Sequence, residues 1–250
     1  MGIDTPEFWT ALLKIIGVNI VLSGDNAVVI ALAARSLHGK QRKQAIFWGS
    51  GAAIALRIVL TLFAVALLAL SWLKLIGAVL LLWIGVKLLI PEDGDSDIQA
   101  SDNLWTAIKT ILVADLVMSL DNVLAVAAAA GGHWGLLIIG LAISIPLVIF
   151  GATLLIKLME RWPVIITGGA GLLGFVAGEM AWEDGAVAGF TSQFPSLAKY
   201  VVAVAGGIFV VVMGRFLAGR TLQRSAEQQL DNLEVVEHGE KASDLKHPTR

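Results

Sequence analysis

The chain has no cysteine among its 250 residues, and only 15% of them are charged. The absence of cysteine excludes disulfides, thiolate metal sites and thiol catalysis. Lys and Arg are spread along the chain without interleaved aromatic residues, which excludes a nucleic-acid-binding protein. The few histidines fall in predicted loops or in the tail: His38, His133, His238 and His247. A ligand held at membrane depth would therefore be bound by oxygen atoms.

Hydrophobic residues are what the chain has in excess. They make up 57% of the sequence and give a mean hydropathy of +0.80, which is too apolar for a soluble domain of this length. Apolar runs of about 20 residues are long enough to span a bilayer. They predict an all-α membrane protein with seven transmembrane helices near residues 10–34, 45–70, 72–90, 104–130, 135–157, 163–182 and 198–218.

The distribution of Lys and Arg predicts the orientation of these helices. Basic residues gather in the loops after the first and fifth helices and after the seventh, whereas the opposite side has only scattered lysines. The positive-inside rule then places the N-terminus outside and the C-terminus inside. Most tryptophans lie near the ends of apolar runs, and only Trp83 does not. Lys87, near the inner end of the third helix, is expected to extend to the cytoplasmic headgroups.

One polar pattern occurs twice within the apolar runs. It consists of Asn or Asp, three apolar residues, Ser, one further residue and Asp-Asn, and it occupies residues 19–26 and 115–122. Because three predicted helices separate the copies, the second enters the membrane from the opposite side. We predict a 3+3 inverted repeat plus a seventh helix, a design in which transporters bind substrate near the membrane midplane.

The repeat divides the chain into five segments. We predict a first three-helix repeat over residues 1–90, an acidic cytoplasmic linker over 91–103, a second, inverted three-helix repeat over 104–182, an outer loop and seventh helix over 183–220, and a polar cytoplasmic tail over 221–250. The tail is expected to begin as a helical extension and then to become disordered.

The two copies of the pattern supply the candidate metal ligands Asn19, Asp25, Asn26, Asp115, Asp121 and Asn122. An ionised aspartate at the membrane centre is costly and is normally retained for ion or proton traffic. Carboxylate and amide oxygens without sulfur suit a hard cation such as Mg²⁺, Ca²⁺ or Mn²⁺. Protonation of one carboxylate would couple transport to a proton gradient. The alternative is a structural clasp, in which these side chains hydrogen-bond across the first and fourth helices.

The copies differ at positions that affect the predicted site. Gly24 in the first copy allows the helix to open and to free backbone carbonyls, whereas the second copy has Leu120, so we expect any break in the first copy alone. The first copy also has the neutral Asn19 where the second has Asp115. The hydroxyls of Ser23 and Ser119 are each expected to bond back to their own helix.

Two further charged residues lie within predicted helices. Arg57, in the middle of the second helix, needs an acidic partner, for which Asp25, Asp115 and Asp121 are the candidates. Arg57 either neutralises the empty site and is displaced by the metal, or forms a permanent ion pair, and the sequence leaves both open. Glu179, at the outer end of the sixth helix, is a candidate pathway residue, although a solvated interfacial carboxylate is the simpler interpretation.

The stretches Val-Leu-Ser-Gly-Asp25-Asn26-Ala and Asp115-Leu-Val-Met-Ser-Leu-Asp121-Asn122-Val resemble the TerC family of integral membrane proteins, in particular its YjbE/YkoY-like branch. The resemblance covers about residues 8–220. It implies membership of the LysE-like transporter superfamily, a multi-pass location in the bacterial cytoplasmic membrane, export of Mn²⁺ and an association with tellurium resistance. It places the family's motif on Asp25, Asn26, Asp115, Asp121 and Asn122.

We therefore expect an exporter of Mn²⁺ or a related divalent cation that alternates access around the two motifs. Its expected partners are the lipid bilayer and the transported cation, without a permanently bound cofactor, and a homo-oligomer is compatible with the sequence. One alternative is an amino-acid exporter of the same superfamily, in which Arg57 would bind the substrate carboxylate. Another is a non-transporting membrane component of a metal or tellurite stress-resistance complex, docked through the polar tail.

An enzyme is the third alternative and is not expected. An intramembrane aspartyl hydrolase would use Asp25 and Asp121 as a dyad that shares a proton. The motifs pair each of these aspartates with an amide that a dyad does not require. The Tyr-Asp and Gly-x-Gly-Asp pairing of presenilin-like proteases is missing from the sequence.

Overall fold

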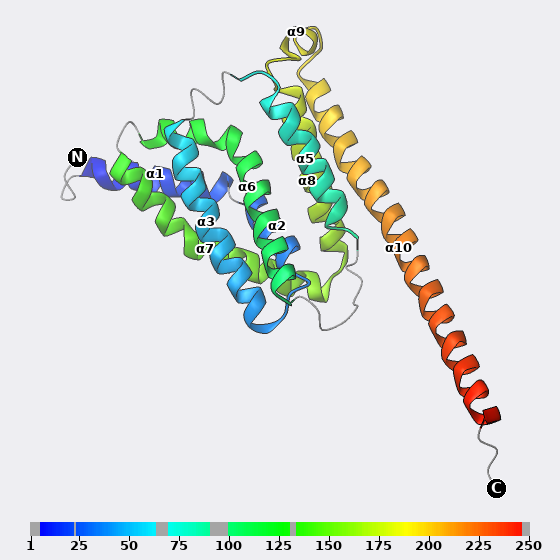
Figure 1. Cartoon of the computed structure of the whole chain (residues 1–250). Helices are drawn as coiled ribbons and strands as arrows, with labels where there is room; N and C mark the ends of the chain where they lie inside the picture. The colour runs from blue at the N-terminus through cyan, green and yellow to red at the C-terminus, as the bar shows by residue number, and fades with distance from the viewer. Residues whose placement is uncertain (1–5, 23, 64–69, 91–99, 131–133, 247–250) are drawn as a thin grey trace.

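The computed structural model describes residues 6–22, 24–63, 70–90, 100–130 and 134–246 (Figure 1). Within the helices, the side chains of 7, 11, 18–22, 100–102, 121–130, 134, 136 and 224–246 lie outside the described part. The elements are all helical, as predicted: α1 (Pro6–Leu22), α2 (Gly24–Ala34), α3 (Gly39–Leu62), α5 (Leu73–Lys87), α6 (Ala100–Ala130), α7 (Trp134–Arg161), α8 (Val164–Trp182), α9 (Ala188–Thr191) and α10 (Leu197–Lys246).

Five stretches of the described helices are long and apolar enough to cross a membrane. They are Gly39–Leu62, Asn103–Leu120, Leu137–Arg161, Val164–Trp182 and Leu197–Gln223. The predicted first and third spans correspond to shorter helices, which are α1 with α2 and α5. The described part of the chain thus establishes a multispanning helical protein, while the number of seven spans and the N-out/C-in orientation stay predictions.

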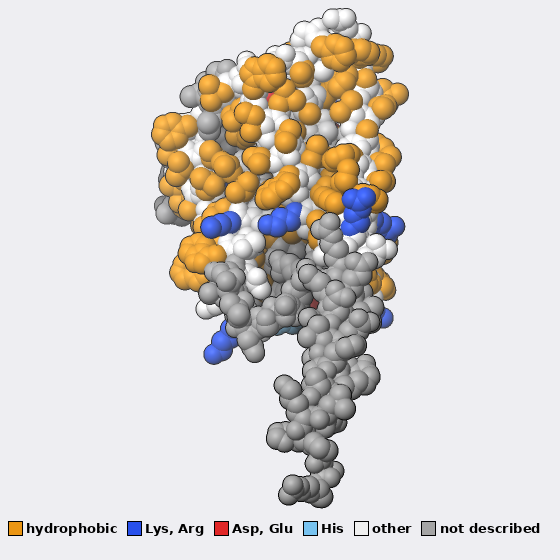
Figure 2. All heavy atoms as spheres, turned by 45° about the vertical axis from the view of Figure 1, so that its right-hand side comes forward, with side chains coloured by type: hydrophobic (Ala, Val, Ile, Leu, Met, Phe, Trp, Pro, Cys, Tyr) orange, Lys and Arg blue, Asp and Glu red, His pale blue; other side chains and the backbone are white. Residues whose placement is uncertain are grey.

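The surface has the pattern of a membrane-embedded body. Hydrophobic side chains cover most of the face in Figure 2, and a band of Lys and Arg side chains crosses it near the lower edge of that apolar area. Basic side chains gather at the cytoplasmic boundary of membrane proteins, so the band marks the side that the positive-inside rule assigns to the cytoplasm.

The predicted first helix is two helices. α1 ends at Leu22 and α2 begins at Gly24, with Ser23 outside the described residues. α1 runs across the bundle rather than along it (Figure 1). The second copy of the polar pattern lies on α6, which continues unbroken through Asp115 and Leu120. A glycine lowers helix propensity by about 1 kcal/mol relative to alanine, which agrees with a break in the glycine-containing copy alone.

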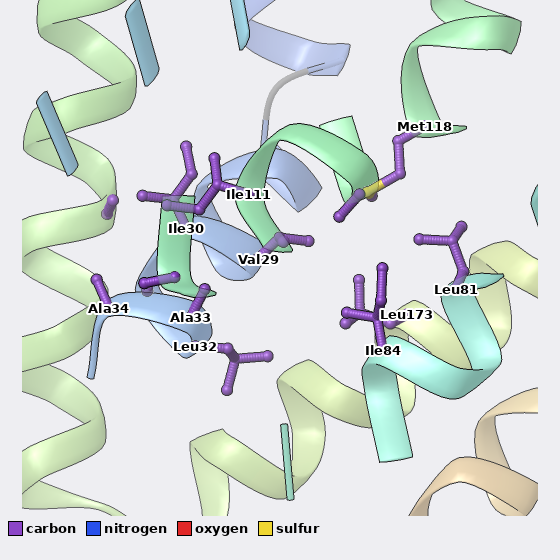
Figure 3. Close-up of a cluster of buried hydrophobic side chains, with 14 of the residues drawn as sticks. Val29, Ile30, Leu32, Ala33, Ala34, Leu81, Ile84, Ile111, Met118 and Leu173 are labelled. Carbon is purple, nitrogen blue, oxygen red and sulfur yellow. The ribbon is translucent and has the colours of Figure 1, made fainter. Parts of the chain in front are cut away.

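α2 is the buried centre of the molecule. Eight of its residues are buried: Asn26, Ala27, Val29, Ile30, Ala31, Leu32, Ala33 and Ala34. A helix that is apolar on all sides packs inside a protein rather than at its surface. Its side chains share one hydrophobic core with those of α5, α6 and α8 (Figure 3). The packing therefore fixes the position of Asp25 and Asn26, which lie in the first turn of this helix.

The helix contacts have the form that an inverted repeat would give. In the predicted repeat, α1 and α2 correspond to α6, α3 corresponds to α7, and α5 corresponds to α8. The contact of α3 with α6 then has its counterpart in the contact of α7 with α1 and α2. The contact of α5 with α6 likewise has its counterpart in the contact of α8 with α2. Gly77 of α5 packs against Val117 of α6, and Gly169 of α8 packs against Val28 of α2. The repeat itself stays a prediction that these contacts support.

The predicted division of the chain into segments stays a prediction. α6 begins at Ala100, inside the predicted acidic linker over 91–103, and residues 91–99 lie outside the described part. The polar tail was expected to become disordered after a helical beginning, but α10 continues as one helix to Lys246. Its membrane half packs closely on α8 because Gly174 and Gly206 leave room for direct backbone contact.

Candidate functional site

Three buried polar side chains meet between α3 and α6. Arg57 Nη2 of α3 donates to Asp115 Oδ1 of α6 at 2.5 Å, and Arg57 Nε donates to Ser119 Oγ at 3.0 Å. The Ser119 hydroxyl in turn donates to Asp115 Oδ2 at 3.3 Å. Arg57 is 2% exposed, Asp115 6% and Ser119 0%. The guanidinium fork thus binds a carboxylate and a hydroxyl one helical turn apart on α6.

Arg57 pairs with one of the candidate carboxylates. Of the two whose side chains are described, Asp25 and Asp115, it is Asp115 that forms the ion pair, and the pair is buried on both sides. Burying two charges removes their hydration, and this loss offsets much of the energy of their mutual attraction. A buried ion pair is therefore weak evidence for a purely stabilising role. Breaking such a pair by removing one partner is nevertheless strongly destabilising.

The prediction for Ser119 is wrong. Its hydroxyl was expected to bond back to its own helix, but it bonds to the side chains of Arg57 and Asp115. A buried guanidinium carries more N–H groups than one carboxylate satisfies, and Ser119 Oγ lies within reach of one of them. Ser144 and Thr61 show the expected behaviour instead, each donating to the carbonyl four residues earlier.

A small cavity adjoins the ion pair. Its volume is about 10 Å³, and its polar lining comes from Asn26 of α2, Ser50 and Arg57 of α3, and Asp115 of α6. This is close to the minimum that holds one water molecule. The cavity brings the first turn of the central helix α2 to the ion pair, as the two-motif hypothesis requires of Asn26 and Asp115.

Ser50 is a polar residue of this cavity that the sequence interpretation missed. It is 1% exposed, and its Oγ has no hydrogen-bond partner among the described residues. A buried hydroxyl without a partner is unusual, because it forfeits its hydration without compensation. A signal was present, since Ser50 and Arg57 are seven residues apart and therefore share one face of α3.

Asp25 lies at the beginning of α2, partly exposed, and one carboxylate oxygen accepts the backbone N–H of Asn26 at 2.8 Å. Helix N-termini favour negative charge, since their first N–H groups have no partner within the helix. Coulombic interactions connect Asp25 with both Arg57 and Asp115. The first motif therefore contributes a second carboxylate to the same electrostatic environment.

The complete predicted ligand set cannot be assembled from the described side chains. Those of Asn19, Asp121 and Asn122 lie outside the described part. Among the residues whose side chains are described, no three Asp, Glu or His groups come together in a metal-binding arrangement. Asp25, Asn26 and Asp115 are thus brought to one region, and the metal site that includes the other three stays a prediction.

Glu179 belongs to a different cluster at the end of α8. Lys199 of α10 lies 3.3 Å from Glu179 and 2.5 Å from Glu183, and Lys74 pairs with Glu183 at 3.5 Å. Burial is the largest single effect and raises the pKa of Glu183, but the hydrogen bonds and positive charges of Lys199 and Lys74 together outweigh it and lower the pKa below its usual value. Glu179 is therefore an ion-pair partner, and its predicted part in a pathway is untested.

Asp184, next to this cluster, fastens the loop after α8 to the beginning of α5. It is 1% exposed, and its carboxylate accepts the backbone N–H groups of Trp72, Leu75 and Ala186 at 3.0, 3.1 and 2.7 Å. Burial raises its pKa, but these N–H bonds outweigh the effect and lower the pKa below its usual value. Asp184 thus caps α5 from a distant part of the chain.

Comparisons with known proteins agree with this picture. The family model described as integral membrane protein TerC family matches residues 4–227. Membrane protein YjbE of Bacillus subtilis is 46% identical over 187 residues, which are 75% of this chain and 86% of YjbE. Membrane protein YkoY of B. subtilis is 28% identical over 197 residues, 70% of this chain and 60% of YkoY. YegH of Escherichia coli is 26% identical over 190 residues, but this covers only 35% of YegH. No solved structure matches the chain.

Proposed function

Because the chain belongs to the TerC family of integral membrane proteins, we propose that it is a transporter that exports a divalent metal cation, specifically Mn²⁺, across the bacterial inner membrane. The observation that carries the proposal is the buried carboxylate of Asp115. It is held by Arg57 beside the first turn of α2, which follows the break between α1 and α2. A charge of this kind inside a membrane protein is a functional-site hypothesis by default.

The chemistry of the cavity supports a hard cation. Asp115 offers a carboxylate, Asn26 an amide oxygen and Ser50 a hydroxyl, and Asp25 adds a second carboxylate nearby. These are the oxygen donors that Mg²⁺, Ca²⁺ and Mn²⁺ prefer, and the chain has no cysteine thiolate to offer a soft metal. Asp121 and Asn122 complete the ligand set in the proposed site, as the motif predicts.

Arg57 acts in this proposal as a tethered competitor of the transported cation. The cavity of about 10 Å³ holds no more than about one water molecule, and the guanidinium occupies the Asp115 oxygen that a cation would need. Cation binding then requires Arg57 to leave, and release of the cation allows it to return. A ligand shifts an equilibrium between two states only by as much as its affinities for them differ. Here the cation binds the state in which Arg57 has left Asp115, because it then replaces the positive charge of the guanidinium.

The arrangement of the helices supports alternating access. α2 and α6 carry the two motifs, and each packs on the helices of both predicted halves. Rocking of one half against the other would expose the region between α2 and α6 first to one side and then to the other. The break before Gly24 supports this, since discontinuous helices form the ion sites of many transporters.

The alternatives have less support. An amino-acid substrate would need Arg57 for its carboxylate, but Asp115 and Ser119 already occupy the guanidinium, and the cavity is far smaller than an amino acid requires. We propose no enzymatic activity, because each motif pairs its aspartate with an amide that an aspartyl dyad of Asp25 and Asp121 would not require. A non-transporting component of a stress-resistance complex would retain full activity after loss of the central carboxylates.

Metal uptake into inside-out membrane vesicles tests the proposal, because export from the cell becomes uptake in this orientation. Vesicles that contain the wild-type chain should accumulate Mn²⁺ in preference to Ca²⁺ and Mg²⁺, and should not accumulate tellurite. Vesicles with the Glu160→Gln variant serve as a control, since this exposed residue pairs with Arg42 away from the cavity. Uptake of an amino acid with no uptake of any metal would replace the proposal with its nearest alternative.

A further inference from the structure

Three helices on one side of the molecule pack mainly on one another in the described part of the chain. These are α5, α8 and α10, which lie side by side in Figure 1. α5 belongs to the first predicted repeat and α8 to the second, so this group coincides with neither predicted half. We call it the three-helix unit, and we call α1, α2, α3, α6 and α7 the five-helix unit. Both copies of the polar motif lie in the five-helix unit.

Backbone contacts hold the three-helix unit together along its length. A Cβ atom added to Gly178 of α8 would lie 2.6 Å from the Cα of Ala203 on α10, and Gly174 and Gly206 meet in the same way one turn further along. α5 packs on both of these helices at Gly85. Small residues allow helices in a membrane to approach until their backbones touch. Helices in such contact have little room to shift against each other.

Polar contacts fasten the same three helices where α8 ends. Lys199 of α10 pairs with Glu179 of α8 and with Glu183, and Lys74 of α5 also pairs with Glu183. The Asp184 carboxylate accepts backbone N–H groups at the beginning of α5. Single exposed ion pairs contribute little to stability, but here several charges form one network. The network joins all three helices at one place and makes them a single body.

The two units meet through apolar side chains of the helices that carry the motifs. A Cβ atom added to Gly77 of α5 would lie 2.7 Å from Cγ1 of Val117 on α6. A Cβ atom added to Gly169 of α8 would lie 2.8 Å from Cγ1 of Val28 on α2. Apolar contacts are non-directional, so packed helices can slide along them by small distances while their surfaces stay buried.

We propose that the three-helix unit moves as one rigid body against the five-helix unit in the transport cycle, an inference that rests on the proposed function. The moving boundary then runs between α5 and α6 and between α8 and α2, rather than between the two sequence halves. Val28 follows Asp25 by three residues, and Val117 follows Asp115 by two. Motion at this boundary therefore acts directly on the helix segments that carry these two carboxylates.

Disulfides introduced one at a time test this inference, because the natural chain has no cysteine. Gly77→Cys/Val117→Cys joins the two units, with 3.7 Å between the added Cβ and the Cβ of Val117. Gly85→Cys/Leu173→Cys joins α5 to α8 within the three-helix unit, with 3.4 Å between the corresponding atoms. Both separations are close to the roughly 3.5–4.5 Å of a disulfide. The pairs are matched, since each fastens α5 to a helix of the second predicted repeat.

Mn²⁺ uptake into inside-out vesicles is measured before oxidation with iodine, after oxidation, and after reduction with dithiothreitol. Labelling of free thiols with a maleimide follows disulfide formation, and the cysteine-free wild type controls for oxidation of other side chains. The disulfide of Gly77→Cys/Val117→Cys should lower uptake to the level of vesicles without the protein, and reduction should restore it. The disulfide of Gly85→Cys/Leu173→Cys should leave the uptake rate as it is in the reduced form.

Loss of uptake with both disulfides would overturn the inference, because α5 would then have to move relative to α8, as motion of the two sequence halves requires. Uptake that persists with the disulfide between the units would overturn it as well. Val28→Cys/Gly169→Cys is a second pair across the boundary, in case the first pair prevents folding. A wild type and reduced variants that take up no metal would instead refute the proposed function, and this inference with it.

Discussion

Arg57 of α3 and Asp115 of α6 form a buried ion pair, with Nη2 and Oδ1 2.5 Å apart. Ser119, one turn further along α6, holds the other edge of the guanidinium. The pair lies beside Asn26 in the first turn of the buried helix α2, so each copy of the repeated polar motif contributes to one small cavity. The function proposed for the chain depends on the ability of this pair to separate.

Removal of Asp115 alone should destabilise the protein strongly. Asp115→Leu removes the carboxylate that pairs with the buried Arg57 guanidinium, and breaking a buried pair in this way costs about 3–5 kcal/mol. The Arg57→Met/Asp115→Leu variant removes both charges and should recover most of that loss, because apolar replacement of a buried pair is often neutral or stabilising. Thermal unfolding in detergent measures both effects. A double variant no more stable than the single one would show that the pair does not act as a unit.

Replacement of Arg57 by lysine should favour cation binding. A lysine keeps the positive charge, but its ammonium cannot reproduce the planar fork that reaches Asp115 and Ser119 together. Loss of one charge-assisted hydrogen bond, worth about 1.5 kcal/mol, weakens the competitor and should lower the KM for Mn²⁺ about ten-fold. Initial uptake rates in inside-out vesicles give this value. A KM equal to that of the wild type, at equal protein content, would identify the ion pair as permanent.

The hydroxyl of Ser50 should serve binding rather than folding. Its Oγ has no hydrogen-bond partner among the described residues, so Ser50→Ala should leave the unfolding temperature unchanged or raise it slightly, by the equivalent of about 1 kcal/mol or less. Mn²⁺ affinity should fall several-fold if the hydroxyl binds the cation. Ser144→Ala is the matched control, since Ser144 is equally buried and its hydroxyl donates to the carbonyl of Gly140. Equal uptake by both variants would remove Ser50 from the site.

Asp184 should make stability depend on pH in the acid range. Burial raises the pKa of its carboxylate, but the backbone N–H groups of Ala186, Trp72, Leu75 and Lys74 together outweigh that effect and lower the pKa below its usual value in the folded protein. Its contribution is therefore fully present above about pH 4 and is lost as the pH falls through the folded-state pKa. Asp184→Asn should cost about 2 kcal/mol at neutral pH and should flatten the loss between pH 5 and 3.

The control for this prediction is Glu160→Gln. Glu160 forms an exposed pair with Arg42, and surface pairs contribute less than about 1 kcal/mol. Its unfolding temperature should follow that of the wild type at every pH. An Asp184→Asn variant with the same acid dependence as the wild type would mean that other carboxylates govern the loss of stability.

The sequence was sufficient to predict the helical membrane architecture and the general position of the polar centre. Apolar runs are long-range signals that depend on composition, so each predicted run corresponds to a helix or a pair of helices in the structure. The need of Arg57 for an acidic partner also followed from the cost of an isolated charge in a membrane. The break of the first apolar run at its glycine-containing copy had a local cause and was therefore predictable.

Other features depended on packing that a single sequence does not contain. The choice of Asp115 over Asp25 as the partner of Arg57 follows from the contact of α3 with α6. Ser119 bonds to side chains because that contact brings the guanidinium within its reach, and Ser50 becomes notable only when the cavity beside it is known. Residues beyond 220 looked like a solvated tail, yet α10 continues through them to Lys246, a stretch that contains no proline.

The most direct test of the central claim compares Mn²⁺ uptake into inside-out vesicles by the wild type and by the Arg57→Met/Asp115→Leu variant, at equal protein content and after thermal unfolding has shown the variant to be folded. The variant retains a packed core but lacks the central carboxylate of α6. If Asp115 binds the transported cation, uptake by the variant falls to the level of vesicles without the protein. Uptake at the wild-type rate would contradict a cation site at Asp115.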